Sequence, residues 1–278
     1  MGSNRRSRPQ AEPTLPRRED CSPHLMEAIF RVDGANVVPS PHAAGPWDPN
    51  MQHGGAPASL VVWAAEKIAT AVPMQVARVT IDLMRPVPVA PLTIETEVLR
   101  EGRKIQLCAV RLKANGVLTV GATVLKIRKQ AQPLPDDVIE PPLDVLSPEQ
   151  SRIEPQNSPF GMGMTIRAAR GRFGGVGPGA IWYRAERPLV AGSPISQAMR
   201  VAAASDFCNA SSALDYRHWT FLNADLTVSM AREPVGEWIL LDAVSWIGPD
   251  GAGLATARLA DVKGYFGRCA QSLVIEKR

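Results

Sequence analysis

The sequence predicts an α+β protein made of two similar halves, each a buried helix followed by antiparallel strands that form a curved sheet. Two observations support this fold class. A mostly apolar helical pattern, followed by several strand patterns of roughly ten residues, occurs twice along the chain. Between the two occurrences, residues 131–160 hold seven prolines, six acidic residues and one base. Proline at this density is incompatible with helix interiors and central strands, so the stretch is expected to be a linker.

The first half begins with a helical pattern in HGGAPASLVVWAAEKIAT, residues 53–70. Its apolar residues recur at helical spacing on a mostly apolar segment, which predicts a buried helix. Segments rich in Val, Ile, Leu and Thr follow, and turn signals such as Asn115-Gly116 indicate hairpins between them. The predicted strands cover residues 76–86, 92–102, 104–116 and 117–129.

The second half repeats this order. A glycine-rich segment, residues 171–179, is expected to be a turn or flexible lid, and it precedes a strand at 179–190. The Ala-rich residues 193–214 predict one helix, opened by Ser193-Pro194. The strands predicted after it cover residues 222–234, 237–248, 253–264 and 265–278.

The two halves can be aligned residue by residue. RVTIDLMRP, residues 78–86, is similar to DLTVSMAREP, residues 225–234, and GATVLKIRK is similar to CAQSLVIEKR near the end. This similarity favours an internal duplication over a chance likeness of two α+β halves. The alignment places Arg85 opposite Arg232, Thr123 opposite Gln271 and Glu66 opposite Asp206.

Composition restricts the class of protein. The chain is 45% hydrophobic and 21% charged, as expected for a globular protein. It has no apolar run near the roughly 18 residues of a membrane-spanning helix, so no integral membrane contact is expected. A net charge of +4 with 5% aromatic residues argues against a nucleic-acid partner. The four cysteines are far apart and form no CxxC pair, which predicts free thiols in a cytoplasmic protein and no metal site.

The predicted organisation has four parts. Residues 1–25 are rich in Arg, Pro and Ser and are expected to be a disordered tail. Residues 26–130 form the first unit, 131–160 the proline-rich linker, and 161–278 the second unit.

Four short motifs resemble a known family. HGGAPASL at the first helix, AAASDF at the second, NADLTV on the next strand and CAQSLV near the end occur in the order and spacing of double-hotdog acyl-CoA thioesterases of the acyl-CoA thioesterase II type. The resemblance covers about residues 27–278. It implies a double hotdog, with two tandem units that are each a long helix wrapped by a curved antiparallel sheet. It also implies hydrolysis of acyl-CoA to a carboxylic acid and CoA in fatty acid metabolism, without cofactor. Because such sheets have edges that can pair, a homo-oligomer is expected.

The resemblance implies three catalytic positions in the second unit. Asp206 is the acid of the SDF motif, and Gln271 is the glutamine of the last strand. The third position is commonly a threonine in the family, and counting back from Arg232 places Asn223 there. A carboxylate can accept a proton from water as a general base, and amide groups can orient that water. Asn223 therefore departs from the family pattern but keeps hydrogen-bonding capacity.

Substrate contacts are expected at the start of the first helix. His53 is a candidate substrate contact, and Gly54 and Gly55 would let a thioester carbonyl approach unpaired backbone N–H donors closely. On the surface, Arg232 and Arg268 are candidates for contacts to the CoA phosphates.

Other functions remain open from the sequence. A serine hydrolase would need a GxSxG elbow, which the sequence lacks. The Asn223 departure leaves room for an acyl-CoA-binding protein that has lost catalysis. A hotdog enoyl-CoA hydratase or dehydratase would use a histidine with an acid, and the second half offers only His218. Glu66 is a candidate second acid, but its half has Thr123 where the other has Gln271, so this site is expected to be degenerate.

Overall fold

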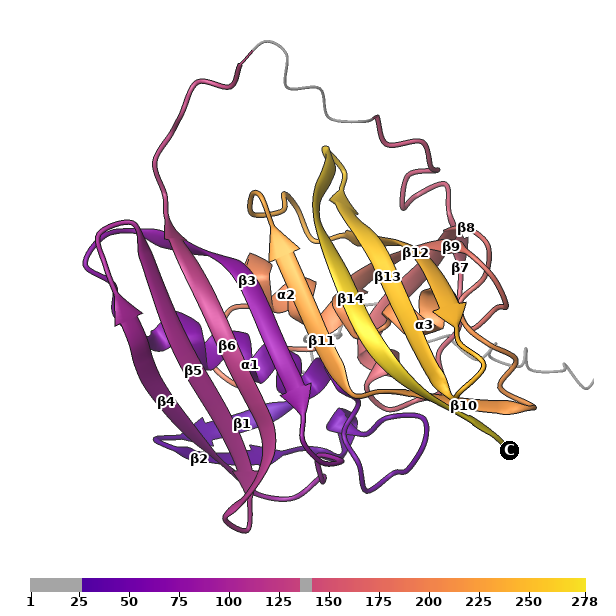
Figure 1. The fold of residues 1–278 in the computed structure, drawn as a ribbon, viewed down its shortest axis with the longest axis horizontal. Helices are drawn as coiled ribbons and strands as arrows, with labels where there is room; N and C mark the ends of the chain where they lie inside the picture. The colour runs from indigo at the N-terminus through magenta and orange to yellow at the C-terminus, as the bar shows by residue number, and fades with distance from the viewer. Residues whose placement is uncertain (1–26, 136–141) are drawn as a thin grey trace, which may run out of the picture.

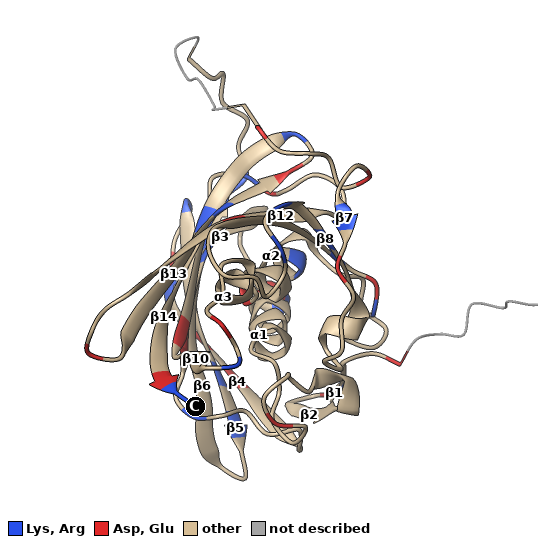
Figure 2. Cartoon of the chain, turned by 90° about the vertical axis from the view of Figure 1, so that its right-hand side faces the viewer, with Lys and Arg blue, Asp and Glu red and all other residues tan. Residues whose placement is uncertain are grey.

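The computed structural model describes residues 27–135 and 142–278 (Figure 1). The predicted tail, residues 1–25, lies outside the described residues, as does part of the predicted linker. The described residues form one antiparallel sheet of fourteen strands with few helices. Figure 2 shows α1, α2 and α3 in the hollow of this curved sheet. No helix among these residues is long and apolar enough to cross a membrane.

The first half contains α1 and six strands, and all five predicted elements are found close to their expected positions. Two short strands, β1 and β2, precede the helix and had no clear alternating pattern. The elements are β1 (Phe30–Asp33), β2 (Asn36–Pro39), the short 3-10 helix η1 (Pro41–Ala43), α1 (Gly55–Lys67), β3 (Met74–Leu83), β4 (Leu92–Glu101), β5 (Ile105–Ala114) and β6 (Val117–Arg128).

The second half contains two helices and eight strands. The helix predicted over residues 193–214 is split in two, because Phe207 leaves helical geometry at φ −81° and ψ 10° and buries its ring. The elements are β7 (Arg152–Ile153), the 3-10 helix η2 (Gly161–Gly163), β8 (Met164–Arg170), β9 (Gly179–Ala185), α2 (Gln197–Ser205), α3 (Cys208–Ser211), β10 (Trp219–Asn223), β11 (Asp225–Met230), β12 (Ile239–Ile247), β13 (Ala252–Asp261) and β14 (Gly264–Lys277).

The two halves meet in the middle of the sheet. The strand order is β1-β2-β4-β5-β6-β3-β11-β14-β13-β12-β9-β8-β7, with β10 pairing β14 beside this path. The order β4-β5-β6-β3 on one side therefore mirrors β12-β13-β14-β11 on the other (Figure 1). Hydrogen bonds between β3 and β11 make the sheet continuous across the two halves.

Four strands of the first half (β3, β4, β5 and β6) are equivalent to four of the second (β11, β12, β13 and β14). Residues that pair in the first half have counterparts 147 residues later that pair in the second. The matched pairs are Thr80–Thr123 with Thr227–Ala270, Ala109–Thr123 with Thr256–Ala270, and Glu95–Arg111 with Asp242–Arg258. The equivalent residues Thr80 and Thr227 are themselves opposite each other where β3 meets β11. A local two-fold axis therefore passes through this central pair.

The register corrects one position of the sequence alignment. Because Thr123 is equivalent to Ala270, the counterpart of Gln271 is Val124, not Thr123. Gln271 and Val124 are both fully buried, whereas Thr123 lies on the outer face. A shift of one residue moves a strand side chain to the other face of the sheet. The sequence similarity alone was too weak to distinguish two alignments that differ by one residue.

The two longer helices, α1 and α2, run antiparallel against each other. At one end, Gly54 and Gly55 before and in α1 lie within contact distance of Asp206 and Ala203 at the end of α2. At the other end, Trp63 Nε1 donates a hydrogen bond of 3.1 Å to Ser193 Oγ ahead of α2. The start of each helix is thus placed beside the end of the other.

Two further segments pack against the second half. Within the predicted linker, Leu143 and Val145 pack around Trp182, whose Nε1 donates to the Leu146 carbonyl at 2.9 Å. The glycine-rich segment 171–179 lies against α3, since Gly174 N–H donates to the Ala210 carbonyl at 2.8 Å. The first segment therefore covers the side of β9 that faces away from α2 and α3, whereas the second borders α3.

Candidate active site

Asp206 lies at the C-terminal end of α2, where its side chain is only 5% exposed. Three side chains contact its carboxylate. Asn223 Nδ2 donates to Oδ1 at 2.8 Å, and Gln271 Nε2 donates to the same oxygen at 3.3 Å. His53 Nδ1 lies 2.9 Å from the other oxygen, Oδ2. The structure thus brings together the residues that the motifs singled out in four separate segments.

The amide of Gln271 is fixed from both ends. Its Oε1 accepts a hydrogen bond from the Asn209 backbone N–H at 3.1 Å, at the start of α3. Its Nε2 also donates to the Asp206 backbone carbonyl at 3.2 Å. With the acceptor end used by a backbone donor, only the NH₂ end can face Asp206, so the orientation of the amide is determined.

Asn223 approaches Asp206 from the end of β10. Its Nδ2 donates to the Asp206 carboxylate and also, at 3.3 Å, to the Asp225 carbonyl. These two bonds occupy both N–H groups of the amide. The Oδ1 of Asn223 is the end of this side chain that can accept a hydrogen bond from a water molecule.

His53 packs against two aromatic rings that also contact each other. Its imidazole stacks on Phe160 with 4.8 Å between ring centroids and lies tilted by 38° against Phe207 at 4.3 Å. Its Nδ1 lies 2.9 Å from Asp206 Oδ2 and 3.1 Å from the Gly55 nitrogen. One ring nitrogen cannot donate to Asp206 and accept from Gly55 at once. If Nδ1 carries a proton, it donates to the carboxylate and leaves the Gly55 N–H for another acceptor.

Glycine is required at the start of α1. A Cβ on Gly54 would lie 2.6 Å from Asp206 Oδ1, and a Cβ on Gly55 would lie 2.6 Å from the Ala203 carbonyl oxygen. Both distances are below those that real Cβ contacts show. The two glycines therefore let the first turn of α1 lie directly against the carboxylate, with its backbone N–H groups at the site.

The two arginine candidates lie elsewhere. Arg232 follows the opposite end of β11 from Asn223 and forms an ion pair with buried Asp261 at 2.5 Å. Burial raises the pKa of Asp261, but hydrogen bonds from Arg232 and two backbone N–H groups outweigh it and leave that pKa below its usual value. Arg268 is exposed on the outer face of β14, away from Gln271.

Three residues of the site were not predicted from the sequence. Phe207 is the last residue of the AAASDF motif and Asn209 is three residues after Asp206, so their proximity in sequence was a usable signal. Phe160 lies at the end of the predicted linker, where no local pattern indicates a role. Its contact with His53 depends on tertiary packing alone.

Solved structures share the overall fold. A protein from Alicyclobacillus acidocaldarius described as having a hot dog fold matches with a TM-score of 0.69 and 17% identity, over 89% of this chain and 95% of that one. The tesB protein of Mycobacterium avium subsp. paratuberculosis matches with a TM-score of 0.68 and 18% identity, over 88% and 95%. An acyl-CoA thioesterase II, TesB2, from Mycobacterium marinum gives 0.59 and 16%, over 86% and 96%. These likenesses show a hotdog fold.

Sequence comparison gives the family. No significant match is found among curated proteins. The profile of the acyl-CoA thioesterase N-terminal domain matches residues 43–127, and that of the C-terminal domain matches residues 135–275. Together with the hotdog fold, these matches show that the chain belongs to the acyl-CoA thioesterase family, whose members hydrolyse acyl-CoA thioesters.

Proposed function

We propose that Asp206 activates the water that hydrolyses the acyl-CoA thioester. The observation that supports this most is the convergence of Asn223, Gln271 and His53 on one carboxylate that is almost excluded from solvent. A carboxylate held in this way is positioned to accept a proton from a water molecule placed beside it. The fixed amides reduce the reorganisation needed when the reaction begins.

The proposed reaction has two steps. Water attacks the thioester carbon while Asp206 accepts its proton, and the carbonyl oxygen becomes an oxyanion. The backbone N–H groups of Gly54 and Gly55, at the positive end of α1, stabilise this oxyanion. The carbon–sulfur bond then breaks, the oxyanion reforms a carbonyl, and the leaving CoA thiolate takes the proton from Asp206. The products are a free carboxylic acid and CoA.

The remaining side chains have supporting roles in this proposal. His53 donates to Asp206 Oδ2, which frees the Gly55 N–H for the substrate, and its face contacts the acyl thioester. Gln271 positions Asp206, whereas Asn223 also offers its Oδ1 to the attacking water. Arg232 is proposed to contact a CoA phosphate. Its side chain is 31% exposed, which supports access, and its pairing with Asp261 holds the guanidinium in place.

We also propose the finer organisation of the molecule. The register that repeats every 147 residues supports two hotdog units in tandem, 26–130 and 161–278, each with its helix wrapped by a curved sheet. Self-association and a cytoplasmic location are part of the proposal. Free thiols at Cys108, Cys208 and Cys269 are compatible with a reducing compartment. Size-exclusion chromatography with light scattering tests the oligomer.

The test is thiol release from a panel of acyl-CoAs of increasing chain length. The purified protein is expected to release CoA, and Asp206→Asn is expected to lower kcat by at least about 10²-fold, the typical contribution of a general base. Glu66→Gln is the matched control, because Glu66 has the corresponding place at the end of α1. It is expected to leave kcat unchanged.

Three results would contradict the proposal. Equal rates for wild type and folded Asp206→Asn would remove Asp206 from the chemistry. A protein that binds acyl-CoA without releasing thiol across the panel would be a binding protein. An enoyl-CoA substrate that gains water without thiol release would indicate a hydratase.

A further inference from the structure

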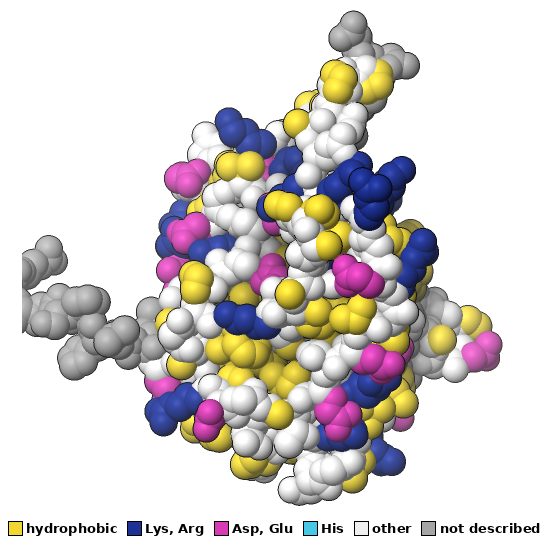
Figure 3. All heavy atoms as spheres, turned by 90° about the vertical axis from the view of Figure 1, so that its left-hand side faces the viewer, with side chains coloured by type: hydrophobic (Ala, Val, Ile, Leu, Met, Phe, Trp, Pro, Cys, Tyr) yellow, Lys and Arg dark blue, Asp and Glu magenta, His cyan; other side chains and the backbone are white. Residues whose placement is uncertain are grey.

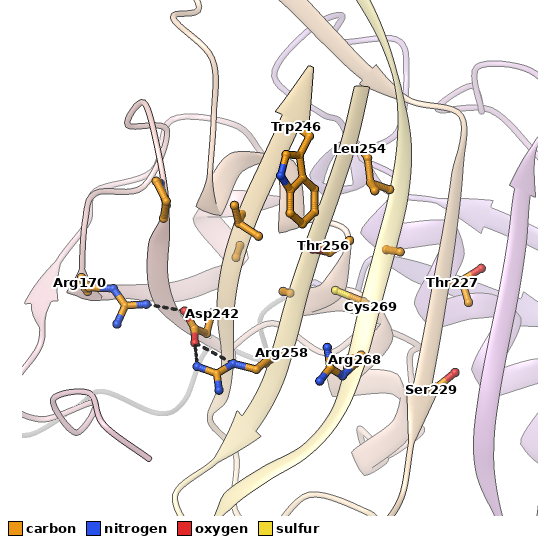
Figure 4. A pocket seen from close by; sticks show the side chains of 15 residues that line it. Arg170, Thr227, Ser229, Asp242, Trp246, Leu254, Thr256, Arg258, Arg268 and Cys269 are labelled. Atoms are coloured by element: carbon orange, nitrogen blue, oxygen red, sulfur yellow. Dashed lines mark hydrogen bonds and ion pairs between the residues drawn. The ribbon is translucent and has the colours of Figure 1, made fainter. Parts of the chain in front are cut away.

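A cavity of about 740 Å³ lies on the outer face of the second-half sheet, across β14 from the active site. Figure 4 shows Arg258 and Arg268 at one end of this groove and Trp246 and Leu254 at the other. The groove and the active site are on opposite faces, since exposed Arg268 is three residues from the inward-facing Gln271 on the same strand. None of the groove's side chains takes part in the proposed hydrolysis.

A row of in-register residues gives this groove a positive charge. The row crosses four neighbouring strands, and each of its residues pairs with the next: Ser229 on β11, Arg268 on β14, Arg258 on β13 and Asp242 on β12. The single acid of the row, Asp242, is shared, because Arg258 and Arg170 each approach it at 2.5 Å. Two arginines thus share one carboxylate, and Arg268 is a third arginine that lines the same groove.

The first half provides an internal comparison for this row. At the equivalent positions the residues are Asp82, Gly121, Arg111 and Glu95. This row has two acids and one base, and Arg111 and Glu95 match Arg258 and Asp242 in charge. The main differences are Arg268 in place of glycine and a neutral serine in place of Asp82. The positive charge is therefore specific to the second half and is not a property of the repeated fold.

The position of Arg268 is electrostatically unfavourable unless an anion binds beside its guanidinium group. Like charges directly opposite each other on neighbouring strands are destabilising, and Arg268 faces Arg258 in this way. Among the residues that the structure describes, no acid or hydrogen-bond acceptor pairs with the Arg268 guanidinium. A phosphate between the two guanidinium groups would accept several charge-assisted hydrogen bonds and relieve the repulsion.

The other end of the groove is suited to a flat or apolar group. Trp246 and Leu254 are opposite each other, and Trp246 is 56% exposed. Trp246 is four residues beyond Asp242 on β12, a separation of about 13 Å in a strand. This spacing fits a molecule with phosphates at one end and a ring that stacks on the indole at the other.

We propose that this groove is a second ligand site that binds a nucleotide, with its phosphates at Arg268 and Arg258 and its base on Trp246. The groove and Asp206 are separated by the sheet, so the ligand is a molecule other than the thioester being hydrolysed at that site. The shared chemistry is that of a nucleoside phosphate, which is present both in free nucleotides and in the nucleotide end of CoA.

The experiment is calorimetric titration of the full chain with ATP at low ionic strength. Wild type is expected to bind, and Arg268→Thr is expected to bind at least tenfold more weakly. Arg111→Thr is the control, because it removes the one arginine of the first-half row, at the position equivalent to Arg258, and it is expected to bind as wild type does. Thermal unfolding of each variant confirms that it is folded.

Further arms separate the two ends of the site and the source of the ligand. Trp246→Leu is expected to weaken the binding of ATP but not that of inorganic tripolyphosphate, whereas Arg268→Thr is expected to weaken the binding of both. Displacement of ATP by CoA would indicate that the site takes the nucleotide end of CoA, and its absence would indicate a free nucleotide. Lack of ATP binding to wild type, or equal binding to wild type and Arg268→Thr, would overturn the proposal. This test does not depend on thioester hydrolysis.

Discussion

The two halves share one backbone register but differ in the side chains at equivalent inner positions. In the second half Gln271 points inward at Asp206, whereas in the first half Val124 has that position. At the end of α1 Glu66 interacts with Ser196 ahead of α2, where the other site has His53 and two glycines. The two halves thus share the strand register but not the polar groups at these positions.

In the first half, a structural contact is found at the end of α1. Lys126, on β6, is almost fully buried and donates to the Ile68 carbonyl at the end of α1 at 3.0 Å. Burial lowers the pKa of this ammonium group, and nearby Cys108 and Glu66 partly oppose the effect. A cation at a helix C-terminus is favourable, so this position now stabilises α1. The comparison indicates that one complete site is formed from both halves.

The largest expected effect is on the free energy of unfolding. It is expected to differ between two arginines at equivalent positions of the two halves, Arg232 and Arg85. Arg232→Ala leaves the carboxylate of Asp261 buried without its ion-pair partner, which is expected to cost about 3–5 kcal/mol of unfolding free energy. Arg85→Ala, the first-half counterpart, removes no such pair among the described residues and is expected to cost less than about 0.5 kcal/mol. Chemical denaturation at pH 7 measures both values.

The pH dependence of this stability difference has a defined sign. The pKa of Asp261 is lowered in the folded state, so the pair's contribution is present above the unfolded value of about 3.9 and is lost as the pH falls through the lower folded value. The difference between wild type and Arg232→Ala is therefore expected to shrink below about pH 4. A difference that stays constant down to pH 2 would show that packing, not charge, is responsible.

The next effect tests how closely α1 must approach the acid. Gly54→Ala places a methyl group 2.6 Å from Asp206 Oδ1, so the helix start or the carboxylate must move. A displacement of about 1 Å at a catalytic group is expected to lower kcat roughly 10²-fold. Gly121→Ala on β6 meets no atom within 4 Å and is the control. Equal kcat values for the two variants would show that the helix start takes no part in the site.

A smaller effect on kcat is expected when Gln271 is replaced by valine, the residue at the equivalent position of the first half. Gln271→Val removes the amide that fixes Asp206 and leaves the Asn209 N–H without its acceptor. Loss of a hydrogen bond to a charged group is expected to lower kcat by roughly 10–100-fold. Ser272→Val, its outward-facing neighbour, is expected to be neutral. Thiol-release kinetics on both variants, with unfolding curves, distinguish positioning from instability.

The smallest effect concerns the departure from the family pattern. Asn223→Thr restores the residue common in the family and keeps a group that can donate to Asp206, so kcat is expected to change less than about fivefold. Asn223→Val keeps the shape of threonine but removes the hydroxyl, and it is expected to be about tenfold slower. If both variants have the same kcat, the hydrogen bond from residue 223 does not contribute.

The sequence was sufficient for the elements with strong periodicity and for the residues in motifs. The helix of the first half and the ten-residue strands were predicted within a few residues, because apolar spacing specifies them directly. The short strands β1, β2 and β7 have too few residues for a pattern. The stacking of Phe160 on His53 and the sharing of Asp242 by two arginines depend on segments far apart in the chain, so only tertiary structure reveals them.

The central pairing of β3 with β11 also has a consequence for how the molecule folds. The paired residues of β3 and β11 are nearly 150 positions apart in the chain, so this contact has a high sequence separation. Long-range strand pairing is slow, and until it forms, both halves have an unpaired strand edge that can aggregate. Because His53 and Asp206 come from different halves, recovery of activity during refolding would follow this late docking step rather than the formation of either half.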